Sequence, residues 1–224
     1  MSMRVLLLLQ ILLLWFCSLM NGETNCKADR KKAAVSEGIY QREGTFIIVR
    51  TYFNKSLSIR CCQLTRPSLD RGNAECKNTL NLPLGRSFNF AELYTINMCI
   101  EECNYIASGY TDADPPYRLD LANIRHNLEE IMPQPQLESV PFMMDAYNKC
   151  EIFRTLHAGR FTLHLPDIEF IEEPCNPFAL QLTICVRMLA MQKCPSRFYL
   201  DTEECRLARN YFTQCVGDIE TNLG

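Results

Sequence analysis

The cysteines constrain what this chain can fold into more than any other feature of its sequence. The chain has 13 cysteines in 224 residues, and Cys17 lies in an apolar segment at the N-terminus. Removal of that segment as a secretory signal leaves 13 − 1 = 12 cysteines. An even number behind a signal peptide predicts a full set of disulfides in an oxidising compartment. The remaining cysteines are Cys26, Cys61, Cys62, Cys76, Cys99, Cys103, Cys150, Cys175, Cys185, Cys194, Cys205 and Cys215.

The N-terminal segment has the order of regions that a secretory signal peptide has. Arg4 precedes an almost uninterrupted apolar run at 5–16, and the small residues Ser18 and Gly22 lie near the junction with polar sequence. The run is too short for a comfortable membrane span, so a signal anchor is the less favoured alternative. We expect a signal peptide at 1–22 and a secreted, extracellular protein without stable membrane insertion.

Charge and length narrow the class of protein further. Loss of Arg4 with the signal changes the net charge from 23 − 26 = −3 to 22 − 26 = −4, and this mild acidity argues against nucleic acid as a partner. The 224 − 22 = 202 remaining residues can bury a sizeable core without help from disulfides. A chain with both a core and many bridges suggests a shape that must persist, for which an internal cavity is one candidate.

Apolar residues recur at helical spacing in five segments and predict an all-α fold. The segments lie at about 90–108, 121–131, 143–159, 177–194 and 201–216. The buried face of the first is expected to carry Ile96, Cys99, Ile100, Cys103 and Ile106.

Several residues mark where these helices begin and end. Asn176 is the expected N-cap of the helix that starts at Pro177, and Gly109 is a C-terminal signal. Asp201 with Glu204 three residues later resembles a capping box.

The N-terminal region is less regular. Residues 45–53 fit a strand or a buried helix, and we favour the helix because everything downstream is helical. Asn54 begins an Asn-Lys-Ser glycosylation acceptor, which predicts a surface position.

Two pairs of neighbouring cysteines indicate how the bridges are distributed. Cys99 and Cys103 are four residues apart and point the same way on a helix, so they more naturally reach two different partners. The adjacent Cys61 and Cys62 are also expected to bond to different partners.

The later cysteines resemble those of the insect odorant-binding proteins of the twelve-cysteine plus-C type. From Cys99 the successive intervals are x3, x46, x24, x9 and x8, and Pro195 follows Cys194 directly. Cys205 and Cys215 occupy the additional C-terminal positions of that subclass.

The resemblance implies a fold and a function. The fold is an all-α, disulfide-stapled helical bundle that encloses an apolar cavity, with N- and C-terminal extensions. Residues 23–75 would be the N-terminal extension, and residues 76–224 the odorant-binding-protein-like domain with an added C-terminal helix. The function is non-covalent transport of small hydrophobic molecules such as odorants or pheromones, with no cofactor and with a chemoreceptor as a further partner.

The resemblance also implies a pairing for six core cysteines. The implied pairs are Cys76–Cys103, Cys99–Cys185 and Cys150–Cys194. Cys61 or Cys62 competes with Cys76 as the first core cysteine. The other six, Cys26, Cys61, Cys62, Cys175, Cys205 and Cys215, allow 15 connectivities, among which the sequence does not choose.

Methionine and aromatic residues near the predicted helices are candidates to line a ligand pocket, because methionine adapts to irregular shapes and aromatic rings offer flat walls. The candidates are Phe142, Met143, Tyr147, Phe153, Phe178, Leu182 and Met188. The alternative for each is an ordinary core position. Tyr147 or Tyr211 could add a polar contact to the ligand.

Catalytic and metal-binding motifs do not account for the sequence. Cys61-Cys62 is followed by Gln63-Leu64-Thr65, so the base histidine of a phospholipase-like Cys-Cys-x-x-His arrangement is missing. We therefore expect no enzyme. The chain has no CxxC pair, and its histidines do not cluster with cysteines, which argues against a metal site. The histidines, His126, His157 and His164, fit surface positions better than a pH switch.

Two other functions remain as alternatives. A secreted protease inhibitor or signalling ligand would act through its surface and would need no small-molecule cavity. A carrier could also work in a fluid outside the olfactory organs.

Overall fold

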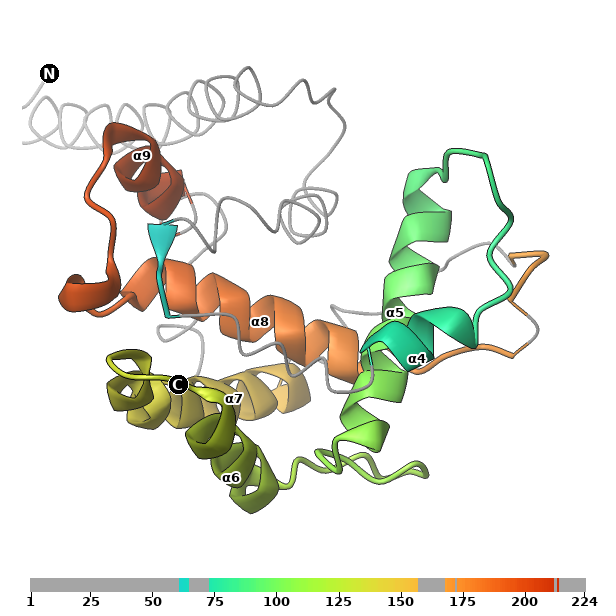
Figure 1. Cartoon of the computed structure of the whole chain (residues 1–224), viewed down its shortest axis with the longest axis horizontal. Coiled ribbons are helices and arrows are strands. Elements are labelled where there is room, and N and C mark those ends of the chain that lie inside the picture. The colour runs from blue at the N-terminus through green and yellow to red at the C-terminus, as the bar shows by residue number, and fades with distance from the viewer. Residues whose placement is uncertain (1–60, 65–72, 157–167, 172, 212, 214–224) are drawn as a thin grey trace, which may run out of the picture.

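The computed structural model describes residues 61–64, 73–156, 168–171, 173–211 and 213 (Figure 1). Several sequence expectations lie outside these residues: the signal peptide at 1–22, the segment 45–53, Asn54, Cys26, Cys215, His157 and His164.

The described part of the chain is helical, as expected from its periodicity. Its α-helices are α4 (Asn73–Asn78), α5 (Phe90–Ala107), α6 (Leu121–Ile131), α7 (Val140–Leu156), α8 (Phe178–Lys193) and α9 (Glu203–Tyr211). Two short 3-10 turns, η1 (Gln136–Ser139) and η3 (Ser196–Phe198), precede α7 and α9. The described ranges contain no strand beyond an isolated antiparallel bridge between Cys62 and Tyr199. None of the described helices combines the length and the apolar character needed to cross a membrane.

Helix α5 begins and ends where its sequence predicts. The Asn89 side chain accepts a hydrogen bond from the backbone N–H of Glu92, and the Glu92 carboxylate accepts one from the N–H of Asn89. At the other end Gly109 has φ +65°, a conformation that favours glycine. A Cβ there would lie 2.6 Å from Nδ2 of Asn123, which donates to the carbonyl oxygen of Gly109.

The expected caps of α8 and α9 both differ in the structure, in which Pro177 is the N-cap of α8 and makes no side-chain cap hydrogen bond. The Asn176 side chain accepts from the N–H of Phe178 at 2.9 Å, although α8 starts at Phe178 and leaves Pro177 just outside. For α9 the expected cap, Asp201, instead accepts from Arg206. The Thr202 hydroxyl, which immediately precedes the helix, accepts from the N–H of Cys205 at 3.2 Å.

Five disulfides form among the described residues, and two of them, Cys76–Cys103 and Cys150–Cys185, join two helices. The five are Cys61–Cys205, Cys62–Cys194, Cys76–Cys103, Cys99–Cys175 and Cys150–Cys185. The expected Cys76–Cys103 bond is confirmed, as are the separate partners of Cys99 and Cys103 and of Cys61 and Cys62.

The expected bonds Cys99–Cys185 and Cys150–Cys194 are wrong. Cys185 lies in the middle of α8, where α7 packs, and its Cα is 5.7 Å from that of Cys150. Cys175 lies before α8, with its Cα 5.0 Å from that of Cys99 on α5. Both distances suit a disulfide, whose Cα atoms are typically about 4.4–6.8 Å apart.

Six of the described cysteines nevertheless pair in the order expected for the core, although they are not the six that were expected to form it. Counted along the chain, the expected pairs join the first cysteine of six with the third, the second with the fifth and the fourth with the sixth. Cys76, Cys99, Cys103, Cys150, Cys175 and Cys185 are paired in this same order. Pro195 therefore follows an additional cysteine, Cys194, and not the sixth of the interlocked set.

Helix α8 lies at the centre of the described structure. Figure 1 shows it between α7 and α9, with α5 crossing near its N-terminal end, and α5, α7 and α9 all contact it. Residues on nearly every side of α8 are buried, among them Leu180, Leu182 and Leu189. A helix that is apolar all round is one that other elements cover.

The bonds at Cys61 and Cys62 generate a prediction about stability. They close loops with sequence separations of 144 and 132 residues, so either bond alone keeps almost the same long loop closed. Loss of one bond then frees only the segment from Cys194 to Cys205, 205 − 194 = 11 residues. The chain-entropy relation gives about 3 kcal/mol for a loop of that size and about 5 kcal/mol for one above 100 residues.

We therefore expect a non-additive loss of the free energy of unfolding, as measured by urea unfolding. The loss in the quadruple variant C61A/C62A/C194A/C205A should exceed the summed losses of C61A/C205A and C62A/C194A by about 2 kcal/mol. A quadruple variant that is unfolded while both double variants fold would agree with this. The bonds Cys76–Cys103 and Cys150–Cys185 close loops that do not overlap, so their losses should add and serve as the control. Simple addition for the first set would contradict the prediction.

Candidate functional site

All seven candidate ligand-binding residues belong to, or pack against, the main apolar core of the described residues, to which α5, α6, α7 and α8 all contribute. We call this core the apolar cluster. The buried members are Met143, Tyr147, Phe178 and Leu182, with exposed fractions of 5 %, 2 %, 3 % and 0 %. Phe142, Phe153 and Met188 are partly buried and pack against the same cluster. The candidates come from residues 142–153 and 178–188, so the fold unites two separate segments of the sequence.

A disulfide and small side chains hold α7 and α8 together. Cys150 of α7 is bonded to Cys185 of α8, and both belong to the cluster. Ala146 and Ala179 are also buried members, and such small side chains allow helices to approach closely. Ile124 and Leu128 of α6 complete the buried apolar surface from a third helix.

Phe178 lies at one edge of the cluster, between an aromatic ring and a cation. The ring of Tyr117 stacks on it with centroids 5.8 Å apart and an interplanar angle of 29°. The guanidinium carbon of Arg154 lies 4.4 Å from the Phe178 centroid. Burial lowers the pKa of Arg154, while the carboxylate of Glu151 opposes that shift. Such a cation–π contact stabilises the position of the ring.

Helix α5 adds a buried face that is polar. Glu101, Asn104, Tyr105 and Ser108 follow the i, i+3, i+4, i+7 spacing of one helical face, and their exposed fractions are 7 %, 2 %, 1 % and 9 %. Ile106, which was expected on the buried face, is 37 % exposed. The expectation was wrong for Ile106 because α8 contacts the side of α5 that carries the polar residues.

Hydroxyl groups from three helices meet at this face. The hydroxyls of Tyr105 and Thr183 are 3.1 Å apart, within hydrogen-bond distance, and Thr183 belongs to α8. Tyr147 of α7 is a further hydrogen-bond partner of Tyr105. We call Glu101, Asn104, Tyr105, Tyr147 and Thr183 the polar seam. Tyr147, which was predicted as a polar contact, lies in it; the side chain of Tyr211 lies outside the described residues.

The electrostatics of the polar seam keep both tyrosines protonated. Burial raises the pKa of Tyr105, and the charge of Glu101 raises it further, against opposing effects of Thr183, Tyr147 and Arg187. Burial also raises the pKa of Tyr147 well above its ordinary value, followed by the effect of Tyr105. Neutral phenols can both donate and accept hydrogen bonds. Tyr105 and Tyr147 also belong to the apolar cluster, so the seam places neutral hydrogen-bonding phenols within it.

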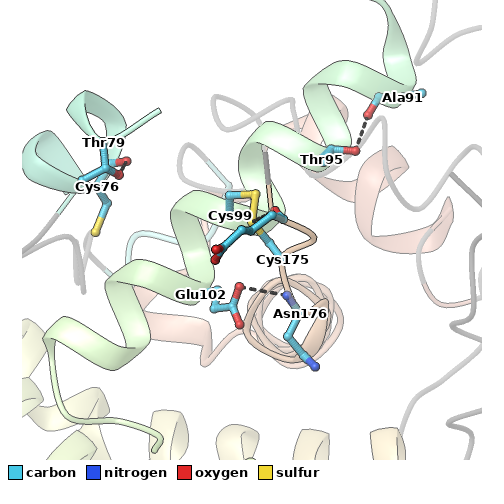
Figure 2. The surroundings of a disulfide bond; sticks show 9 residues. Cys76, Thr79, Ala91, Thr95, Cys99, Glu102, Cys175 and Asn176 are labelled. Atoms are coloured by element: carbon cyan, nitrogen blue, oxygen red, sulfur yellow. Dashed lines mark hydrogen bonds between the residues drawn. A yellow bond between two sulfur atoms is a disulfide. The ribbon is translucent and has the colours of Figure 1, made fainter. Parts of the chain in front are cut away.

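A partly buried contact links α5 to the residues just before α8. The carboxylate of Glu102 accepts a hydrogen bond from the backbone N–H of Asn176 at 2.8 Å, beside the Cys99–Cys175 bond (Figure 2). Burial raises the pKa of Glu102, and the Asn176 N–H partly offsets this.

The polar seam was missed at the level of sequence because the buried face of α5 was traced through apolar residues. Its signal was present as polar residues that recur three and four positions apart, from Glu101 to Ser108. His126 is exposed on α6, as expected for a surface histidine.

Comparison with known proteins finds no match to this chain among protein-family models, curated proteins or solved structures.

The raised pKa of Glu102 predicts a pH-dependent stability. A carboxyl group whose pKa is higher in the folded state favours folding when it is protonated, so its contribution falls as pH rises from 4.5 through the folded value. Glu102→Gln keeps an acceptor for the Asn176 N–H and cannot ionise. We expect the melting temperature of E102Q to rise relative to wild type between pH 4 and 7, as measured by circular dichroism.

Glu92 provides a control of opposite sign. Its pKa is lowered, chiefly by the hydrogen bond from the Asn89 backbone. Its stabilising contribution is therefore present above its unfolded pKa and is lost as pH falls, so E92Q should lose stability relative to wild type as pH rises. The same pH trend in both variants would contradict these assignments.

Proposed function

We propose that this protein is an extracellular carrier that binds small hydrophobic molecules reversibly, in the manner of the plus-C odorant-binding proteins. The disulfides among the described residues indicate an oxidising environment, such as that outside the cell. Within that setting, the fold offers an apolar cluster and a polar seam that share Tyr105 and Tyr147.

The observation that carries the proposal is the order in which the cysteines pair. Three interlocked bonds, Cys76–Cys103, Cys99–Cys175 and Cys150–Cys185, follow the order that the resemblance implies. The order is found on a set in which Cys175 takes the place of Cys194, and of the three expected bonds only Cys76–Cys103 is formed. The shared order of pairing is the feature of the described disulfides on which the proposal rests.

The composition of the apolar cluster supports the same function. Met143, Met144 and Met188 belong to it or pack against it, and methionine adapts to ligands of irregular shape. The mechanism we propose is transfer of apolar ligand surface from water into a cavity at the apolar cluster, to which α5, α6, α7 and α8 contribute, worth about 25 cal/mol per Å². The disulfides would keep that cavity open when no ligand is bound.

An introduced tryptophan tests the proposal directly. The only tryptophan of the chain, Trp15, lies in the expected signal peptide, so the secreted form should have no tryptophan fluorescence of its own. We expect the emission of Phe178→Trp to shift saturably as an apolar ligand is added, because Phe178 belongs to the cluster. N-phenyl-1-naphthylamine, a fluorescent apolar probe, should bind at low micromolar concentration and be displaced by the same ligand.

Phe88→Trp is the matched control. Phe88 contacts Phe170 and Arg86, outside the apolar cluster, so its reporter should not respond to ligand. If neither probe uptake nor a shift at position 178 occurs in folded, fully oxidised protein, the carrier function is wrong. A secreted surface-binding protein, such as a protease inhibitor or signalling ligand, would then take its place. Immunolocalisation would distinguish an olfactory carrier from one in another fluid.

A further inference from the structure

Asn104 of α5 is a buried amide whose hydrogen bonds are unmade. The side chain is 2 % exposed, and neither its nitrogen nor its oxygen has a hydrogen-bond partner. Leaving a buried polar group unpaired destabilises the folded state, so most proteins avoid it. An amide left unpaired at both ends indicates a position where a partner from outside the chain can bind.

The surroundings of Asn104 restrict the chemistry of that partner. Asn104 lies in the polar seam, three residues after Glu101 and next to Tyr105, on the face of α5 that contacts α8. The negative charge of Glu101 acts on Tyr105 and Tyr147. That charge disfavours a carboxylate at the seam and favours a neutral group.

A hydroxyl group satisfies both ends of an amide. It donates one hydrogen bond to the side-chain oxygen and accepts one from the side-chain nitrogen. An ether or ester oxygen can only accept, so it would leave the Asn104 oxygen unpaired and buried. The amide therefore discriminates between two ligands that have the same apolar area.

We propose that Asn104 binds the hydroxyl group of the ligand, so that the molecules carried are apolar alcohols. This inference rests on the proposed function, since it requires that a ligand occupies the apolar cluster at the polar seam. To the proposed carrier function it adds the chemical class of the ligand, an apolar alcohol, and the residue that selects that class, Asn104.

Two isomers provide the test. 1-Dodecanol and methyl undecyl ether have the same formula, and each is used to displace N-phenyl-1-naphthylamine from the oxidised, secreted form of the chain. We expect wild type to bind the alcohol about tenfold more tightly, as one well-made hydrogen-bonded contact implies. We expect Asn104→Leu, which replaces the amide with an apolar side chain of similar size, to bind the two isomers within about twofold.

The control is the same substitution at another asparagine of α5. Asn97 is partly buried, and its side-chain nitrogen already donates to the carbonyl oxygen of Leu93 at 2.6 Å. Asn97→Leu should therefore retain the preference for the alcohol. Without ligand, N104L should melt at the same temperature as wild type or higher, because it removes an unpaired buried group. N104A replaces N104L if that variant fails to fold.

The outcomes separate this inference from the proposed function. Equal affinities for the two isomers in wild type, or a preference that persists in N104L, overturn the role of Asn104 and leave the carrier function standing. Failure of the folded protein to take up the probe at all overturns both.

Discussion

The described structure depends on the way in which α8 is held. One disulfide lies three residues before the start of this helix, at Cys175, a second lies at its middle, at Cys185, and a third immediately follows it, at Cys194. These bonds tie α8 to α5, to α7 and to the segment at Cys62, so the helix cannot slide or rotate without breaking a covalent link. The apolar cluster and the polar seam both include α8 residues, and their relative positions follow from this restraint.

Hydrogen bonds within the polar strip offset part of the cost of burying it next to an apolar core. Tyr105 and Thr183 form a hydrogen bond, which offsets the cost of removing their hydroxyls from water. At the junction of α5 and α8 the Glu102 carboxylate accepts a hydrogen bond from the Asn176 N–H, which likewise offsets the cost of removing it from water. Cys99–Cys175 keeps the two helices together at that junction, independently of either contact. The chain can therefore keep buried polar groups that packing alone would disfavour.

The helices were predictable from the sequence where local chemistry determines them. Gly109 after α5 and the contact between the Asn176 side chain and the Phe178 N–H act within a few residues, so these helix ends could be inferred without the fold. The capping box at Asn89 is equally local but was not predicted. The pairing of Cys175, Cys185 and Cys194 could not, because the intervals of nine and eight residues between them are nearly the same. Which one bonds to Cys150 depends on the side of α8 that faces α7, and tertiary packing determines that side. The polar seam was missed for a related reason, since apolar periodicity cannot reveal a buried polar face.

The interlocked bonds have a consequence for the lifetime of the protein in a fluid that contains proteases. The segment 112–116 between α5 and α6 is exposed and is an accessible place for a peptide bond to be cut. Such a cut would leave Cys61, Cys62 and Cys99 on one fragment and Cys205, Cys194 and Cys175 on the other. Three disulfides would still join the two fragments, and Cys150–Cys185 would keep α7 and α8 together within one of them. A molecule cut at this segment would thus remain covalently linked, with its apolar cluster intact.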